Sequence, residues 1–187
     1  MWYTFRMNRP EMLPSYSYRY YEGPLSLEQL QQKPPVGNCR RAVQDYYWTF
    51  HGKYLGSEDI VFPEALKNEG IIVKKFQNDT DDFSSDLQTG DIVYAEKLRD
   101  SRGIVFSSAK HVSLSEEERM RNFHLGVYIG VPTAEILARI PTIEVIDKGR
   151  PTIWHASFIA GGTDLWPVDR FCYYYRPVLA TRLLTGE

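Results

Sequence analysis

The chain has 187 residues, with 22 Lys and Arg against 24 Asp and Glu, so its formal net charge is −2. Hydrophobic residues make up 43% and charged residues 25%, which is typical of a folded globular protein and not of a disordered one. This charge balance argues against a general nucleic-acid binder, which carries a basic excess. The length fits a single domain, residues 1–187, that can bury enough surface to fold without a disulfide or a metal.

No apolar run approaches the roughly 18 residues that a membrane-spanning helix needs. The first residues also lack the basic and then apolar pattern of a secretory signal peptide. We therefore expect a cytoplasmic protein without a membrane partner, or one that is exported by a non-classical route. The two cysteines, Cys39 and Cys172, are expected to be free thiols in a reducing compartment.

The predicted helices come early in the chain. Residues 1–25 are rich in Tyr and Arg and are predicted to form an irregular arm, and residues 26–187 are predicted to form the core. Capping residues and apolar residues at helical spacing predict helices at 26–32, 39–50 and 63–68. Asn38 is the expected N-cap of the second helix, and Gly52 is its expected stop.

The later part of the chain is predicted to form strands, at 71–76, 91–95, 124–130, 142–146, 152–157 and 172–182. The last of these is interrupted at Pro177, and Gly161-Gly162 is predicted to be a turn. Two insertions separate the strands: residues 99–123, with a short helix after Ser115, and residues 132–141, which are predicted to be helical. Helices followed by strands indicate an α+β fold with an antiparallel sheet.

Cys39 is the first candidate for chemistry because it is predicted to lie in the first turn of a helix, next to Arg40 and Arg41. Unpaired backbone N–H groups and two cations favour the thiolate, which is the nucleophilic form of cysteine. The same N–H groups can stabilise a developing oxyanion. A buried cysteine that only fills the core is the common alternative, and the cysteine alone favours that alternative.

Two histidines on predicted strands are candidates for acid–base chemistry. Strand alternation puts His124, Gly126 and Tyr128 on one face and leaves the apolar residues between them on the core face. The missing side chain of Gly126 would let another element, such as a helix carrying a thiolate, approach the imidazole of His124. His155 can orient such a base, with Ser157 as a weaker candidate for this role.

These features occur together in one order along the chain. The run Gly37-Asn38-Cys39 opens a helix, Gly90-Asp91 opens a strand, residues 124–130 read His-Leu-Gly-Val-Tyr-Ile-Gly, and Trp154-His155-Ala156 follows. Residues 36–157 thereby resemble the NlpC/P60 family of papain-like cysteine peptidases. The resemblance implies a papain-like fold in which the nucleophile helix packs on an antiparallel sheet, here with two insertions. Family members usually carry Asp before the Cys and Ser-Gly after it, where this chain has Asn38, Arg40 and Arg41.

The resemblance also implies roles and a reaction. Cys39 would be the nucleophile, His124 the general base, and His155 the residue that orients His124. The chain would be an enzyme, a cysteine peptidase or amidase that cleaves an amide bond through a thioester. The implied substrate is a peptide or muropeptide, cut between D-glutamate and the diamino acid of peptidoglycan stem peptides. Two alternatives stay open: an inactive binding module on the same fold, and an acyltransferase or an amidase of the CHAP kind.

The remaining expectations concern substrate contacts and cofactors. Tyr18 and Tyr20 belong to a block of tyrosines without core periodicity and are predicted to contact substrate, as is Asn38 beside the nucleophile. No metal-binding or phosphate-binding motif is present in the sequence, so no cofactor is expected. The sequence leaves the oligomeric state open.

Overall fold

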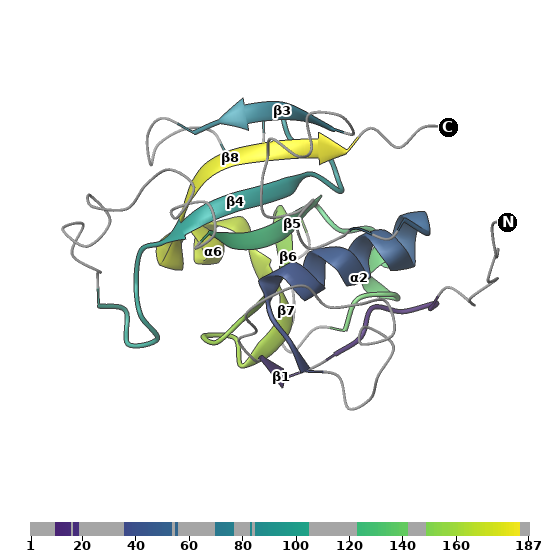
Figure 1. Ribbon diagram of the computed structural model, residues 1–187, viewed down its shortest axis with the longest axis horizontal. Coiled ribbons are helices and arrows are strands. Elements are labelled where there is room, and N and C mark those ends of the chain that lie inside the picture. Colours follow the sequence, from purple (N-terminus) through teal and green to yellow (C-terminus); the bar gives the residue numbers. More distant parts are fainter. Residues whose placement is uncertain are drawn as a thin grey trace, which may run out of the picture.

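Helix α2 (Cys39–His51) packs against a β-sheet in the computed structural model (Figure 1). The structure describes residues 10–15, 17–18, 36–53, 55, 70–76, 83, 85–104, 123–141 and 149–183. The other helices of this part of the chain are short: α5 (Ala134–Leu137) and α6 (Val168–Tyr174). The strands are β1 (Ser17–Tyr18), β2 (Val36–Gly37), β3 (Gly70–Lys75), β4 (Ile92–Lys97), β5 (His124–Gly130), β6 (Thr152–Ser157), β7 (Gly162–Pro167) and β8 (Tyr175–Leu183).

The described strands form one eight-stranded sheet in the order β2-β1-β7-β6-β5-β4-β8-β3. Seven of them are joined by antiparallel pairings, and β2 pairs with β1 in parallel. The predicted α+β class with an antiparallel sheet is therefore confirmed. β5 and β6, which carry the two candidate histidines, are neighbours near the middle of the sheet, and their pairing includes Gly126 opposite His155.

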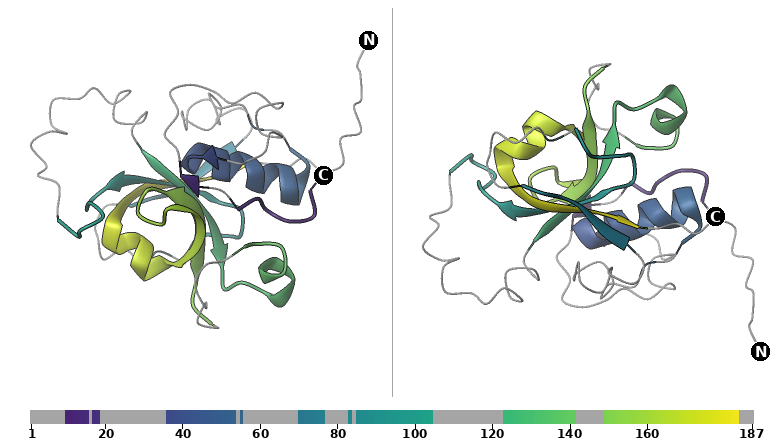
Figure 2. Two further views of the ribbon diagram at one scale, coloured as in Figure 1. Left: turned by 90° about the horizontal axis from the view of Figure 1, so that it is seen from below. Right: turned by 90° about the horizontal axis from the view of Figure 1, so that it is seen from above.

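The two faces of the sheet carry separate apolar clusters, one packed against α2 and the other against α6. Leu125, Val127 and Ile129 of β5 pack with α2, as their alternation in the sequence predicts. The opposite face packs with α6 and holds a second cluster that includes Val93, Tyr128, Ile153, Trp166, Phe171 and Tyr175. Figure 2 shows α2 and α6 on opposite sides of the sheet. Both faces of β5 are thus buried, and the face that carries His124 packs against apolar residues as well.

Local hydrogen bonds fix both ends of α2. The Oδ1 atom of Asn38 accepts the backbone N–H of Arg41 at 3.1 Å, which caps the first turn. Gly52 has φ 65°, and its N–H reaches the carbonyl of Trp48, so the helix stops in the left-handed conformation that glycine tolerates. Both boundaries agree with the prediction to within one residue, and the tyrosines on its apolar face, Tyr46 and Tyr47, are buried.

Three predicted elements differ from the structure. Residues 168–174 form α6, where a strand from 172 was expected, so Cys172 is a half-buried helix residue. The strand β8 begins at Tyr175 and continues past Pro177 with a register shift. The turn expected at Gly161-Gly162 is followed by the strand β7, which the prediction missed. The arm expected to be irregular adds β1 to the sheet.

Other predictions fall wholly or partly on residues outside the described ranges. These are the helices at 26–32 and 63–68, the helix after Ser115 and the strand at 142–146. In the second insertion, helix α5 is one turn within the predicted segment 132–141. No helix in the described part of the chain has the length and apolar character needed to cross a membrane.

Candidate active site

Cys39 is the first residue of α2, and nearby backbone N–H groups lower the pKa of its thiol. They belong to Leu125 at the start of β5, to Arg40 and to Cys39 itself. Burial is the larger effect and raises the pKa above its ordinary value. The expectation of a resting thiolate is therefore wrong, because a helix N-terminus does not offset the loss of solvation here.

The expected pair of cations beside the sulfur is reduced to one. Arg40 lowers the pKa of the Cys39 thiol through its charge. Arg41 is buried, and its Nε lies 3.3 Å from Asp45 Oδ2 on the next turn of the helix. Arg41 therefore stabilises α2 and leaves Arg40 as the arginine that acts on the sulfur.

His124 and His155 form a direct hydrogen bond. Nε2 of His124 lies 2.8 Å from Nδ1 of His155, and the two rings are perpendicular at 89°. Gly126 is the residue directly opposite His155 in the sheet. His124, two residues earlier on β5, is therefore the diagonal neighbour of His155 and lies within reach of its side chain. The structure thus brings together the two histidines that the sequence analysis paired.

Both imidazoles are neutral at physiological pH. Burial, with a smaller effect of Lys97, lowers the pKa of His124 to about 3. Burial also lowers the pKa of His155 well below its ordinary value, with contributions from His124 and Arg170. A neutral His124 has a lone pair that can accept a proton, whereas a charged one has none, but its low pKa makes it a weak base toward a thiol.

The hydrogen bond between the rings decides which nitrogen of His124 is left for chemistry. Because His155 occupies Nε2, Nδ1 is the nitrogen that remains to accept a proton. If His124 is to accept a proton at Nδ1, it donates its Nε2–H to His155, and the proton of His155 is then on its own Nε2. Among the described residues this Nε2 has no hydrogen-bond partner. The His155 ring lies between Trp166 and Phe171, with ring centroids 4.5 and 5.4 Å away.

The space left by the missing side chain of Gly126 is occupied by β6 and α6, and not by the helix that carries Cys39. A Cβ on Gly126 would lie 2.5 Å from Cγ2 of Ile153 and 3.5 Å from the ring of Phe171. The glycine therefore lets Ile153 of β6 and Phe171 of α6 pack closely against β5, whereas α2 covers the opposite face of β5. Cys39 lies close to the beginning of β5, where the N–H of Leu125, the residue after His124, lowers the pKa of its thiol. No hydrogen bond joins Cys39 to His124, both of which are described residues.

The three residues predicted to contact substrate, Tyr18, Asn38 and Tyr20, lie in different surroundings or outside the described part of the chain. Tyr18 is half-buried in β1, and its ring lies edge-on to Phe158 at 6.4 Å. Phe158 is 69% exposed, so this pair presents an aromatic surface near the site. Asn38 is buried and uses its side-chain oxygen to cap α2, and its contact with substrate stays a prediction. Tyr20 lies outside the described residues.

Ser157, the weaker orienting candidate, contacts other residues than His124. Its Oγ accepts the backbone N–H of Ala160 at 3.0 Å and shares a hydrogen bond with the hydroxyl of Tyr175. The ring of Tyr175 in turn stacks on His124, with centroids 4.0 Å apart and planes at 10°. The sequence analysis missed Tyr175 because it lies in a run of tyrosines that was assigned to a strand.

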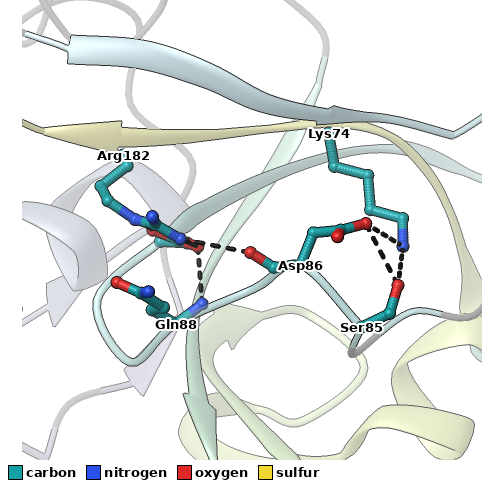
Figure 3. A network of polar contacts seen from close by, with 6 residues as sticks. Lys74, Ser85, Asp86, Gln88 and Arg182 are labelled. Atoms are coloured by element: carbon teal, nitrogen blue, oxygen red, sulfur yellow. Dashed lines mark hydrogen bonds and ion pairs between the residues drawn. The ribbon is translucent and has the colours of Figure 1, made fainter.

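The Gly90-Asp91 turn has a structural role. Asp91 accepts two hydrogen bonds of 2.8 Å from Arg182 of β8 and one of 2.7 Å from the N–H of Gln88. Figure 3 shows Arg182 directed toward the segment that carries Asp86 and Gln88, while Lys74 meets Ser85 and Asp86 farther along it. This network joins β3 and β8 to the turn before β4.

Within the described residues, no group of three or more His, Cys, Asp or Glu side chains could hold a metal ion. The titratable groups that the structure places at this end of β5 are a thiol at a helix N-terminus and two hydrogen-bonded neutral imidazoles. Comparison with protein-family models, curated proteins and solved structures yields no match to this chain.

Proposed function

We propose that this chain is a cysteine hydrolase that cleaves amide bonds through a thioester intermediate, on a papain-like fold of the NlpC/P60 type. The observation that carries the proposal is the 2.8 Å hydrogen bond between His124 and His155, with Cys39 at a helix N-terminus where the N–H of Leu125, the residue after His124, acts on its thiol. A Cys–His pair with a third group that orients the base is the minimum that such chemistry needs. The sequence motifs around the three residues add the resemblance to the family.

The proposed reaction begins with a neutral thiol and a neutral imidazole. Nδ1 of His124 takes the proton of Cys39 as the sulfur attacks the carbonyl carbon, so no thiolate has to accumulate beforehand. The N–H groups of Cys39 and Arg40, which favour negative charge at the sulfur, would also stabilise the oxyanion that forms beside it. His124 then protonates the leaving amine, and water, deprotonated by His124, hydrolyses the thioester.

The proposed substrate is a peptide, with stem peptides of peptidoglycan as the first class to test. This class comes from the family resemblance. Tyr18 and Phe158 support a binding surface for part of the substrate, because both lie near Tyr175 and Ser157 of the site. Tyr18→Ala should raise KM more than it lowers kcat, since an aromatic surface contributes binding and no proton transfer.

The test is hydrolysis of a panel of peptide amides and muropeptides, followed by mass spectrometry. The wild type should release an amine and an acid, and Cys172→Ser, which removes the other thiol, should do the same. Cys39→Ala should be inactive, and His124→Ala should lose on the order of 10²–10⁴ in rate. Retained turnover in Cys39→Ala would exclude the proposal.

The same panel separates the proposal from its alternatives. Addition of an amine or alcohol acceptor diverts a thioester to a new amide or ester, so a product that forms only with the acceptor would indicate an acyltransferase. The raised pKa of the Cys39 thiol is the observation that favours an inactive binding module. Such a module would bind peptides without turnover, and His124→Ala would leave its affinity unchanged.

A further inference from the structure

Tyr175 is a buried residue that contacts the proposed base but has no part in the reaction described above. It is the first residue of β8, directly after α6, and is 3% exposed. Its ring lies face to face with His124 at 4.0 Å and 10°. Phe171 of α6 supports the same ring from another side, with centroids 5.0 Å apart.

The hydroxyl end of Tyr175 is fixed separately from its ring. Ser157 shares a hydrogen bond with this hydroxyl, and Ser157 is itself held by the N–H of Ala160 in the turn between β6 and β7. The ring of Tyr175 is thus attached at one end to β8 and at the other to β6. In their ionised forms Cys39 and Tyr18 would raise the pKa of the Tyr175 hydroxyl, so this hydroxyl lies within electrostatic range of the sulfur.

The hydrogen bond to His155 leaves one motion of His124 unrestrained. A single hydrogen bond at Nε2 fixes that atom but allows the ring to tilt about it, which would change the direction in which Nδ1 points. A flat ring at 4.0 Å prevents this tilt. The same face attracts a cation, so it favours the imidazolium that forms when His124 accepts the proton of Cys39.

We propose that Tyr175 is the positioning residue for His124: its ring fixes the plane of the imidazole, and its hydroxyl, held by Ser157, fixes the ring. This inference rests on the proposed function, because it assigns Tyr175 a role in activating Cys39. The ring carries the effect, and the hydroxyl acts only through the placement of the ring.

The test compares Tyr175→Leu, which removes the aromatic face, with Tyr175→Phe, which keeps it. Each full-length variant is treated with iodoacetamide at pH 6, and the labelled cysteine peptides are quantified by mass spectrometry. In alkylation the sulfur forms a bond to the carbon of the reagent, iodide leaves, and the thiol proton passes to His124. Labelling of Cys172 in the same sample is the internal control for folding.

Tyr175→Leu should slow the labelling of Cys39 by about tenfold or more, since a displaced base loses its alignment with the thiol. Tyr175→Phe should stay close to the wild-type rate, and Cys172 should react equally in all three proteins. Unchanged labelling of Cys39 in Tyr175→Leu would overturn the inference. A loss in Tyr175→Phe as large as in Tyr175→Leu would also overturn it, because the hydroxyl would then carry the effect.

A nuclear magnetic resonance measurement covers the case in which Tyr175→Leu does not fold. In the wild type, the ring protons of His124 should be shifted upfield by the face of Tyr175 and should show cross-relaxation with its ring, and Tyr175→Phe should preserve both signals. Absence of both signals would contradict the inference. Turnover of peptides is read separately: slow labelling in Tyr175→Leu without turnover in the wild type sustains the inference and removes the proposed function. Unchanged labelling of Cys39 in Tyr175→Leu, together with turnover of peptides by the wild type, removes the inference and sustains the proposed function.

Discussion

At Cys39, burial and hydrogen bonding act on the thiol in opposite directions, and burial prevails. The neighbouring imidazoles are kept neutral by the same loss of solvation. The resting protein therefore holds a thiol and two neutral imidazoles, and in the proposed reaction proton transfer coincides with attack. The two arginines that follow Cys39 in the sequence suggest a thiolate at this position. In the structure, consecutive residues of a helix point in different directions, and Arg41 pairs with Asp45.

The role of His155 can be tested at this scale with two substitutions. His155→Ala removes the acceptor for Nε2–H of His124 and should lower kcat by about tenfold to a hundredfold, a milder loss than in His124→Ala. His155→Asn keeps an acceptor close to the position of Nδ1 and should retain more activity than His155→Ala. Equal kcat values for the two variants would show that the hydrogen bond does not orient the base.

Among the elements, helix α2 and the two histidine strands were predictable, because each carries strong local signals. Asn38 and Gly52 mark the ends of α2, and the limits of β5 and β6 agree with the prediction. Helix α6 was not predictable: residues 168–174 are dense in aromatic residues typical of strands, and packing under the sheet decides their conformation. Tyr175 was missed for the same reason, since its contact with His124 depends on where α6 ends.

The close packing between β5 and β6 gives a prediction at the scale of elements. Gly126→Ala would place a Cβ against Cγ2 of Ile153 and should lower the free energy of unfolding by about 1–3 kcal/mol. Ile153→Ala should cost about 2–5 kcal/mol by leaving a cavity. The double variant should be more stable than the sum of the two losses, because the new methyl group enters that cavity.

Chemical denaturation of the four proteins in this cycle measures the coupling. Additive losses would mean that Gly126 does not provide the space for Ile153. The His124–His155 contact depends on the same strand spacing, so Gly126→Ala should also slow any turnover.

For the whole molecule, two histidines buried in neutral form make stability depend on pH. In the unfolded chain they bind protons as the pH falls below about 6.5, whereas the folded state holds the pKa of His124 at about 3. The unfolded state is then favoured as the pH falls. The free energy of unfolding should decrease by up to about 1.4 kcal/mol per pH unit for each such histidine.

Urea denaturation between pH 7 and pH 4.5 tests this dependence with a matched pair of variants. His155→Asn should reduce the slope of stability against pH. His51→Gln, which removes an exposed histidine of α2, should leave it unchanged. A slope in His155→Asn equal to that of the wild type would show that His155 does not stay neutral in the folded protein.

The central claim is that His124 removes the proton of Cys39, and the pH dependence of cysteine alkylation tests it most directly. A base whose pKa is about 3 is fully available from pH 5 to pH 7, so the rate of Cys39 labelling by iodoacetamide should be nearly constant across this range. Cys172, which lies on α6 outside the proposed triad, should react more slowly at lower pH, by about tenfold per unit, as its thiolate is lost. In His124→Ala, Cys39 should acquire the same steep dependence. A Cys39 rate that falls with pH in parallel with Cys172 in the wild type, or that His124→Ala leaves unchanged, would contradict the account.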